Sequence, residues 1–197
     1  DPSSRCHEVL NGLIRMAVSL NAAVAEQDAV DRALDIALEL PGVSCGWLLL
    51  LEGDAAFRLA GARNLPPEFR TPGAMTGDCR CRRLLLDGQF TAAANMVDCE
   101  RAADRGLACF RHASIPLWAA DRKIGLLNLA GPDGGVFDDD FLRVLHAIGN
   151  TIGAAIERIR LHARTERTAR QTETRYRRLL EQSQDGIFIL DVSGVIR

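Results

Sequence analysis

The feature that most constrains the fold is a pair of strand–turn–strand segments, each joined by a turn too short to hold a crossover helix. The four strands predicted from these segments are residues 45–51, 56–63, 109–118 and 123–130. Strands joined by such short turns run antiparallel, because parallel neighbours need a crossover of a dozen or more residues. We therefore expect an antiparallel sheet, to which residues 91–97 add a further strand.

Helical patterns lie on both sides of these strands. Apolar residues recur at helical spacing within residues 5–26, and a second helix is predicted from a cap at Asp28 to Leu40. A long helical stretch begins near Asp138. The order predicts an α+β fold, with the terminal helices packed on one face of the sheet. The irregular segment between the strand pairs, with a short helix at residues 79–86, should cover the other face and enclose a pocket.

The last helix carries a short heptad pattern. Apolar or small residues recur every seven positions in two rows: Leu145, Ile152 and Ile159, then Gly149, Ile156 and Ala163. Such a seam is typical of helices that pair between chains. We expect a parallel homodimer through the terminal helices, residues 5–26 and 138–163. Residues 164–175 are almost without apolar side chains but favour helix, so we expect a continuous helical connector.

Composition excludes several classes of protein. The chain is 47% hydrophobic and 25% charged, as in globular proteins, and no apolar run approaches the length of a membrane span. The net charge of −2 argues against a nucleic-acid partner, which needs a concentrated basic face. No signal-peptide pattern is present, so we expect a cytoplasmic location. The chain begins without Met and stops just after a strand-like run, which suggests an excerpt of a larger protein.

Several segments together resemble a GAF domain, a small-molecule sensory module. They are Gly77–Cys81, Arg111–Leu117, Ile124–Ala130 and the helix Phe137–Leu161. The resemblance implies a GAF-like domain over residues 1–162, with a long exit helix. Residues 163–182 would form a helical linker, and residues 183–197 resemble the start of a PAS domain. This series is similar to the input half of bacterial sensor histidine kinases, which belong to two-component systems, and of diguanylate cyclases.

The resemblance does not identify a ligand. GAF domains of this kind bind cyclic nucleotides, bilins, haem or iron–sulfur clusters, or have no known ligand. The cyclic-nucleotide signature Asn-Lys-X-X-Phe is absent. Cys109 precedes His112 by three residues, which does not match the adjacent Cys and His of bilin-binding relatives.

Four of the six cysteines fall between Cys79 and Cys109, and clusters of this kind are typical of metal or redox sites. Cys79 and Cys81 lie at the predicted entry of a short helix beside Arg80, Arg82 and Arg83. The helix dipole and these charges favour the thiolate, which is both metal ligand and nucleophile.

We expect Cys79, Cys81 and Cys99 to converge on the pocket, with His112 or Cys109 as a fourth metal ligand. Strand alternation places the last two on opposite faces without choosing between them, whereas the family resemblance favours His112. An iron–sulfur cluster or zinc would suit these ligands. Two alternatives stay open: the thiols are packing residues, or Cys79 and Cys81 form a strained disulfide that acts as a redox switch.

The favoured function is a sensory input module that couples a ligand, metal or redox event in the pocket to a dimeric exit helix and a downstream output domain. The excerpt itself is expected to be non-catalytic. A thiol-based enzyme similar to GAF-like methionine sulfoxide reductases is one alternative. A purely structural dimerisation domain is the other.

Overall fold

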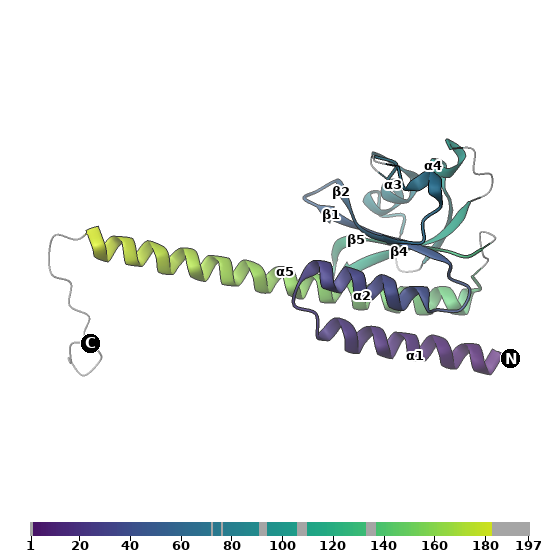
Figure 1. Ribbon diagram of the computed structural model, residues 1–197, viewed down its shortest axis with the longest axis horizontal. Helices are drawn as coiled ribbons and strands as arrows, with labels where there is room; N and C mark the ends of the chain where they lie inside the picture. The colour runs from purple at the N-terminus through teal and green to yellow at the C-terminus, as the bar shows by residue number, and fades with distance from the viewer. Residues whose placement is uncertain are drawn as a thin grey trace. The chain divides into compact units, whose positions relative to one another are not determined.

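The computed structural model describes residues 2–71, 73–75, 77–90, 94–105, 110–132 and 137–182 (Figure 1). The chain divides into two compact units, Asp1–Ile159 and Arg160–Arg197. The first unit contains a sheet with helices on both faces. The described part of the second unit is helical and belongs to α5 (Asp139–Gln182).

The sheet has five antiparallel strands in the order β2-β1-β5-β4-β3. The strands are β1 (Cys45–Glu52), β2 (Ala56–Arg63), β3 (Asn95–Asp98), β4 (Arg111–Ala119) and β5 (Arg122–Ala130). The two predicted hairpins form β1–β2 and β4–β5, and β1 pairs with β5 between them. The predicted antiparallel sheet is therefore confirmed, with the strand expected in residues 91–97 seen as β3 at the edge.

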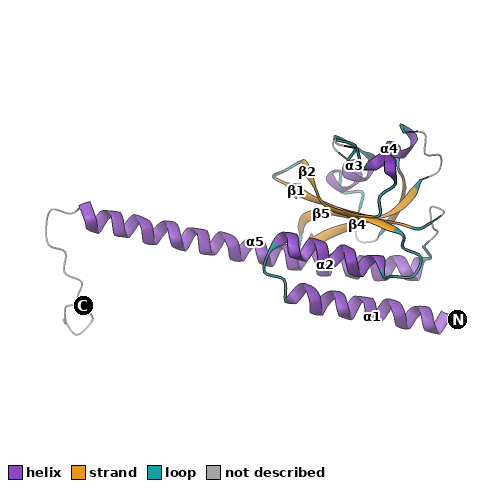
Figure 2. Cartoon of the chain, viewed as in Figure 1, coloured by secondary structure: helices purple, strands orange, loops and turns teal. Residues whose placement is uncertain are grey.

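One face of the sheet is covered by α2 (Glu26–Leu38) and the first part of α5, and α1 (Pro2–Asn21) packs against α2 on the side away from the sheet (Figure 2). Their apolar side chains form one core with alternate residues of the strands. Examples from the strands are Leu48, Leu50, Ile115 and Leu117, all of them fully buried. The terminal helices thus pack on one face of the sheet, as predicted.

Two glycines bring α5 into backbone contact with β4. A Cβ atom at Gly149 would lie 2.7 Å from the carbonyl oxygen of Pro116, and one at Gly153 would lie 2.3 Å from that of Trp118. Real Cβ contacts are never this short, so any larger residue would push the helix off the strand. Gly149, which was predicted for a seam between chains, therefore serves a helix–strand contact within one chain.

The large members of the predicted seam are also used inside the chain. Leu145, Ile152 and Ile159 are buried in the core between α5 and the sheet. The expectation that they form a seam with a second chain was wrong. A helix lying on a sheet also places apolar residues at every seventh position, within a wider apolar stripe, so the heptad spacing alone could not tell the two contacts apart.

The predicted start of α2 is wrong, whereas the predicted start of α5 is correct. The predicted cap Asp28 lies inside α2, which begins after Ala25, and Asp28 instead accepts a hydrogen bond from Arg32 Nε at 2.6 Å. Asp138, in contrast, accepts a hydrogen bond from the backbone N–H of Phe141 at 2.8 Å and caps α5. The acidic first turn of α2 still faces the favourable end of the helix dipole.

The opposite face of the sheet is covered by η1 (Pro67–Phe69), α3 (Arg80–Leu86) and α4 (Glu100–Ala103) (Figure 1). These short elements enclose a second apolar core, separate from the first. The predicted cover over this face is therefore confirmed, with the expected short helix at α3 and a helical turn at α4.

Residues 183–197, which resemble the start of a PAS domain, lie outside the described residues. The division at residues 162 and 182 stays a prediction, although α5 does run continuously through residues 164–175. Within the described part of the chain, no helix is both long and apolar enough to cross a membrane.

Candidate functional site

A small cavity lies between the sheet and the cover formed by α3 and α4. Its volume is about 10 Å³, close to the space that one water molecule needs. Side chains from both layers line it, among them Trp47, Cys79, Cys81, Cys99, Arg101 and His112. We call it the thiol cavity. Its three cysteines come from two segments twenty residues apart, which the fold brings to one place.

Cys79 and Cys81 are in direct contact. Their Sγ atoms lie 3.1 Å apart, and the two residues are 6% and 4% exposed. Cys79 is the extended residue before α3, and Cys81 lies in the first turn of that helix. The change from extended to helical backbone places the two side chains on the same side. Both thiols are free.

Two buried arginines hold the segment that precedes Cys79. Arg82 donates to the carbonyl oxygen of Met75 at 2.9 Å and also to that of Gly77. Arg101 donates to the carbonyl oxygens of Ala74 at 3.1 Å and Gly77 at 2.7 Å. Both guanidinium groups therefore converge on Gly77. Arg82 Nε has no hydrogen-bond partner within the described residues, so these bonds do not satisfy every donor of the two groups.

The three thiols differ in acidity. The pKa of Cys79 is lowered to about 5, first because the thiol of Cys81 donates to its sulfur, and then because of the Arg82 backbone amide and the Arg101 guanidinium. The pKa of Cys81 is raised by that same hydrogen bond and by burial. Burial also raises the pKa of Cys99. Cys79 is therefore the thiolate of the group, and Cys81 holds the proton.

His112 projects from β4 toward the same cavity. It is 2% exposed, and its ring centroid lies 4.9 Å from that of Trp47. Neither ring nitrogen has a hydrogen-bond partner within the described residues. Burial lowers the pKa of His112 to about 4, so the imidazole is neutral at physiological pH. A neutral, unpartnered imidazole facing a cavity is free to accept a hydrogen bond or to bind a metal.

A second polar pair lies on the same face of the sheet. Ser114, two residues after His112, donates to Asn128 Oδ1 across the β4–β5 pair at 2.6 Å. Both residues are fully buried, and Asn128 Nδ2 has no partner in the described part of the chain. Sequence reasoning missed this pair because an alternating strand pattern does not distinguish a buried Ser or Asn from an exposed one.

Four of the five predicted metal ligands line the thiol cavity, namely Cys79, Cys81, Cys99 and His112. Cys109 lies outside the described residues. Among the residues that the structure describes, no three His, Cys, Asp or Glu side chains are grouped closely enough to hold a metal ion. A zinc or iron–sulfur site therefore stays a prediction.

The arginines were only partly predicted. Of the three expected to favour the thiolate, Arg82 is buried, whereas Arg80 and Arg83 are exposed and Arg83 pairs with Asp78 and Glu100. Arg101 was missed altogether. It reaches Gly77 from twenty-four positions along the chain, and no spacing in the sequence indicates that contact.

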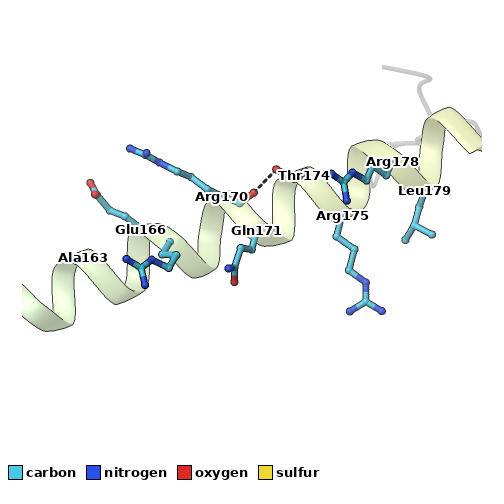
Figure 3. Close-up of a pocket in the computed structure, with 9 residues that line it drawn as sticks. Ala163, Glu166, Arg170, Gln171, Thr174, Arg175, Arg178 and Leu179 are labelled. Atoms are coloured by element: carbon cyan, nitrogen blue, oxygen red, sulfur yellow. Dashed lines mark hydrogen bonds between the residues drawn. The ribbon is translucent and has the colours of Figure 1, made fainter. Parts of the chain in front are cut away.

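The described helix of the second unit has its own surface hollow. Figure 3 shows side chains projecting outward from one length of α5, including Glu166, Arg170, Arg175 and Leu179. Thr174 Oγ1 donates to the carbonyl oxygen of Arg170 at 2.8 Å. This bond lies within the helix, and the hollow is an open helix surface rather than an enclosed site.

The structure and sequence are similar to those of known sensory proteins. The sensor histidine kinase YhcY of Bacillus subtilis (strain 168) is 31% identical over 190 residues, which are 91% of this chain and 50% of the relative. The chain thus spans about half the length of that relative.

Solved structures show the same fold at low identity. One is the GAF domain of a phosphoenolpyruvate-protein phosphotransferase from Coxiella burnetii, with a TM-score of 0.63 and 14% identity, covering 80% of this chain and 97% of that one. Another is a GAF domain assigned to a sensor histidine kinase from Pseudomonas syringae pv. tomato, with a TM-score of 0.60 and 16% identity, covering 84% and 97%. The family model described as GAF domain matches residues 23–157, more than half of the chain. With its five-stranded sheet, helical face and covered cavity, the chain belongs to the GAF domain family.

Proposed function

We propose that this chain is the sensory input module of a bacterial signalling protein, in which a chemical event at the thiol cavity is passed to α5. One observation carries the proposal: β4 faces the cavity on one side and contacts α5 on the other. His112 of β4 lines the cavity, whereas the backbone of Pro116 and Trp118 lies against the glycines of α5.

The contact is suited to transmit small movements. Protein interiors are close-packed, so a shift of a few tenths of an ångström at one side of a strand must be taken up by its neighbours. The glycines of α5 leave no flexible side chain between helix and strand that could absorb such a shift. A state of the cavity that moves β4 therefore favours one position of α5 over another, and differential stability of the two positions is what couples the sites.

The output belongs to a part of the protein beyond the matched region. The chain aligns with half of a sensor histidine kinase, so we propose that α5 leads to a histidine kinase output domain in the same chain. From the resemblance of residues 183–197 to the start of a PAS domain, we propose a further module between them.

The volume of the thiol cavity argues against the enzymatic alternative. Pockets that bind small molecules have volumes of roughly 300–1,000 Å³, whereas this cavity has about 10 Å³. A methionine sulfoxide substrate does not fit it, and we propose that the chain has no turnover of its own. A purely structural role leaves the buried, unpartnered imidazole of His112 without a purpose.

We also propose that the module is a homodimer through α1. Its outer face carries Leu10, Ile14 and Val18, spaced four residues apart and 51%, 54% and 68% exposed. Residues four apart lie on one side of a helix, so they form an apolar stripe. A second copy of the chain carries the same stripe, and two such stripes bury each other about a twofold axis.

The test of coupling is the substitution Gly153→Ala, which adds a methyl group where the backbone of Trp118 leaves no room. The matched control is Ala154→Ser, which adds one atom to the exposed side of the same turn. Each variant is joined to the unmatched half of the Bacillus subtilis kinase, and autophosphorylation is measured beside the thermal stability of the chain. We expect Gly153→Ala to change the autophosphorylation rate severalfold, and Ala154→Ser to leave it unchanged. A folded Gly153→Ala variant with unchanged autophosphorylation would refute the coupling.

A further inference from the structure

We infer that Cys79 and Cys81 form a redox-sensitive pair that hydrogen peroxide oxidises to a disulfide, with Cys79 as the attacking thiolate. The inference rests on the proposed function, because it names the chemical signal that the input module receives. Nothing in the family match or in the relatives' descriptions assigns such a site.

The first argument is distance. The two Sγ atoms are 3.1 Å apart, and a disulfide bond is about 2.05 Å long, so bond formation needs them to approach by only about 1 Å. The carbonyl oxygen of Cys79 caps α3 by accepting from the backbone N–H groups of Arg82 and Arg83, both at 3.1 Å, so the sulfurs approach by side-chain rotation rather than by movement of that backbone. Cys45, buried in the same apolar core, makes no such contact with another sulfur within the described residues.

The second argument is charge. Two guanidinium groups are buried around the loop that leads into Cys79, and they donate to neutral carbonyl groups. A positive charge buried near a thiol favours its ionised form, and the guanidinium group of Arg101 acts on Cys79 in this way. The same charges stabilise the hydroxide that leaves when a peroxide bond breaks.

The chemistry balances with one peroxide. The Cys79 thiolate attacks one peroxide oxygen, so that a sulfur–oxygen bond forms, the oxygen–oxygen bond breaks and hydroxide leaves. That hydroxide takes the proton of Cys81 and becomes water. The Cys81 thiolate then attacks the sulfur of Cys79, a sulfur–sulfur bond forms and a second hydroxide leaves. Two electrons pass from the two sulfurs to the peroxide, which yields one disulfide, one water and one hydroxide.

The size of the cavity selects the oxidant. A space close to one water molecule admits small peroxides and excludes bulky organic hydroperoxides. Cys99 is partly exposed, whereas Cys79 and Cys81 are buried. We therefore expect hydrogen peroxide to react much faster than cumene hydroperoxide.

Disulfide formation changes the side of the thiol cavity that lies opposite β4. Closing the ring moves the two sulfurs toward each other at the start of α3, where Arg82 holds the carbonyl groups of Met75 and Gly77. His112 lines the same cavity from β4, so the altered packing reaches the strand that contacts α5. Reduction by cellular thiols restores the starting state.

The experiment titrates the fully reduced 197-residue chain with hydrogen peroxide and follows its intact mass. We expect the loss of two hydrogen atoms for each peroxide consumed, and a peptide map that links Cys79 to Cys81. Cys45→Ser is the matched control, because Cys45 is 5% exposed in the same core, and this variant should react like the parent.

Two substitutions separate the steps. Cys81→Ser keeps a hydroxyl donor beside Cys79 but cannot close a disulfide, so a sulfenic acid at Cys79 should accumulate and appear in the intact mass as the gain of one oxygen atom. Cys81→Ala also removes the donor, and at pH 6 its Cys79 should be oxidised at least about tenfold more slowly. Thermal melts show that both variants are folded before they are compared.

Two results would overturn the inference. One is a chain that stays reduced while free cysteine in the same solution is oxidised, and the other is a disulfide that links Cys79 to Cys99. Amide hydrogen exchange is also measured in β4 and in residues 139–159 of α5, before and after oxidation. This measurement separates the test of the disulfide from the test of the proposed function. A disulfide that forms without changing that exchange supports the thiol chemistry and contradicts the coupling. A changed autophosphorylation rate in Gly153→Ala, in a chain that peroxide does not oxidise to the disulfide, supports the coupling and contradicts the thiol chemistry.

Discussion

The alkylation rate of Cys79 should fall much less between pH 7 and pH 5.5 than the rate of an ordinary thiol. The perturbation is a change from pH 7 to pH 5.5, and the quantity measured is the alkylation rate of Cys79. With a pKa of about 5, Cys79 stays mostly thiolate over this range, because a thiol with a lowered pKa loses its charge only as the pH falls through that value. The charged and titratable groups near it are Arg82 and those that line the thiol cavity: Arg80, Cys81, Asp98, Cys99, Glu100, Arg101 and His112.

The expected magnitude follows from the fraction of thiolate. A thiol with the ordinary pKa of about 8.5 loses roughly thirtyfold of its thiolate between pH 7 and pH 5.5. Cys79 loses only about a quarter of its thiolate over the same range. The ratio of rates at the two pH values should therefore be about 1.3 for Cys79 and about 30 for a free thiol.

The assay is pulsed alkylation with iodoacetamide at both pH values, followed by digestion and mass spectrometry of the peptide that contains Cys79. Burial slows alkylation equally at both pH values, so it cancels in the ratio. Cys45, whose pKa is raised by burial, is the internal control and should slow by the full thirtyfold. A thirtyfold fall at Cys79 as well would refute the assignment of this residue as the thiolate.

Three further outcomes are expected. His112 has a pKa of about 4 in the folded chain and an ordinary value of 6.5, so as the pH falls protons bind the unfolded chain first. The free energy of unfolding should therefore drop by up to about 3 kcal/mol between pH 6.5 and pH 4. In urea titrations, His112→Phe should reduce this dependence of stability on pH. Gly125→Ala should lower the free energy of unfolding by at least about 2 kcal/mol, because its Cβ would lie 2.1 Å from the carbonyl oxygen of Leu49. In thermal melts the control Gly12→Ala should cost far less stability, because its Cβ would meet only a flexible side chain. Ile14→Glu should convert the dimer to a monomer in light scattering without lowering the melting temperature, and a monomeric parent chain would contradict the α1 interface.

The sheet was predictable because its signals are local. Residues 56–63 are identical in prediction and structure, and the other three hairpin strands shift by one or two residues at their ends. A strand pattern and a short turn act over fewer than ten residues, so the sequence carries them directly. The start of α2 was misplaced by three residues because Asp is favourable inside the first turn of a helix as well as at its cap, and Asp28 there pairs with Arg32 one turn later.

The candidate site was predictable only in part. The short spacing of Cys79 and Cys81 at a helix entry indicated a thiolate, and the structure places both sulfurs in contact. The buried charge of Arg101 depends on a contact across twenty-four residues, which no local pattern encodes.

By itself, the sequence determined the strands, the terminal helices, the thiol pair and the family to which the chain is similar, because each depends on neighbouring residues or short spacings. Only the tertiary structure decided which surface each apolar stripe covers. Leu145, Ile152 and Ile159 could have met a second chain, but they lie on the sheet because Gly149 and Gly153 let α5 approach β4 more closely than any other residue would allow. The same close packing brings Cys99, Arg101 and His112 to the thiol pair, since long-range contacts arise from the shapes of whole elements rather than from the order of residues.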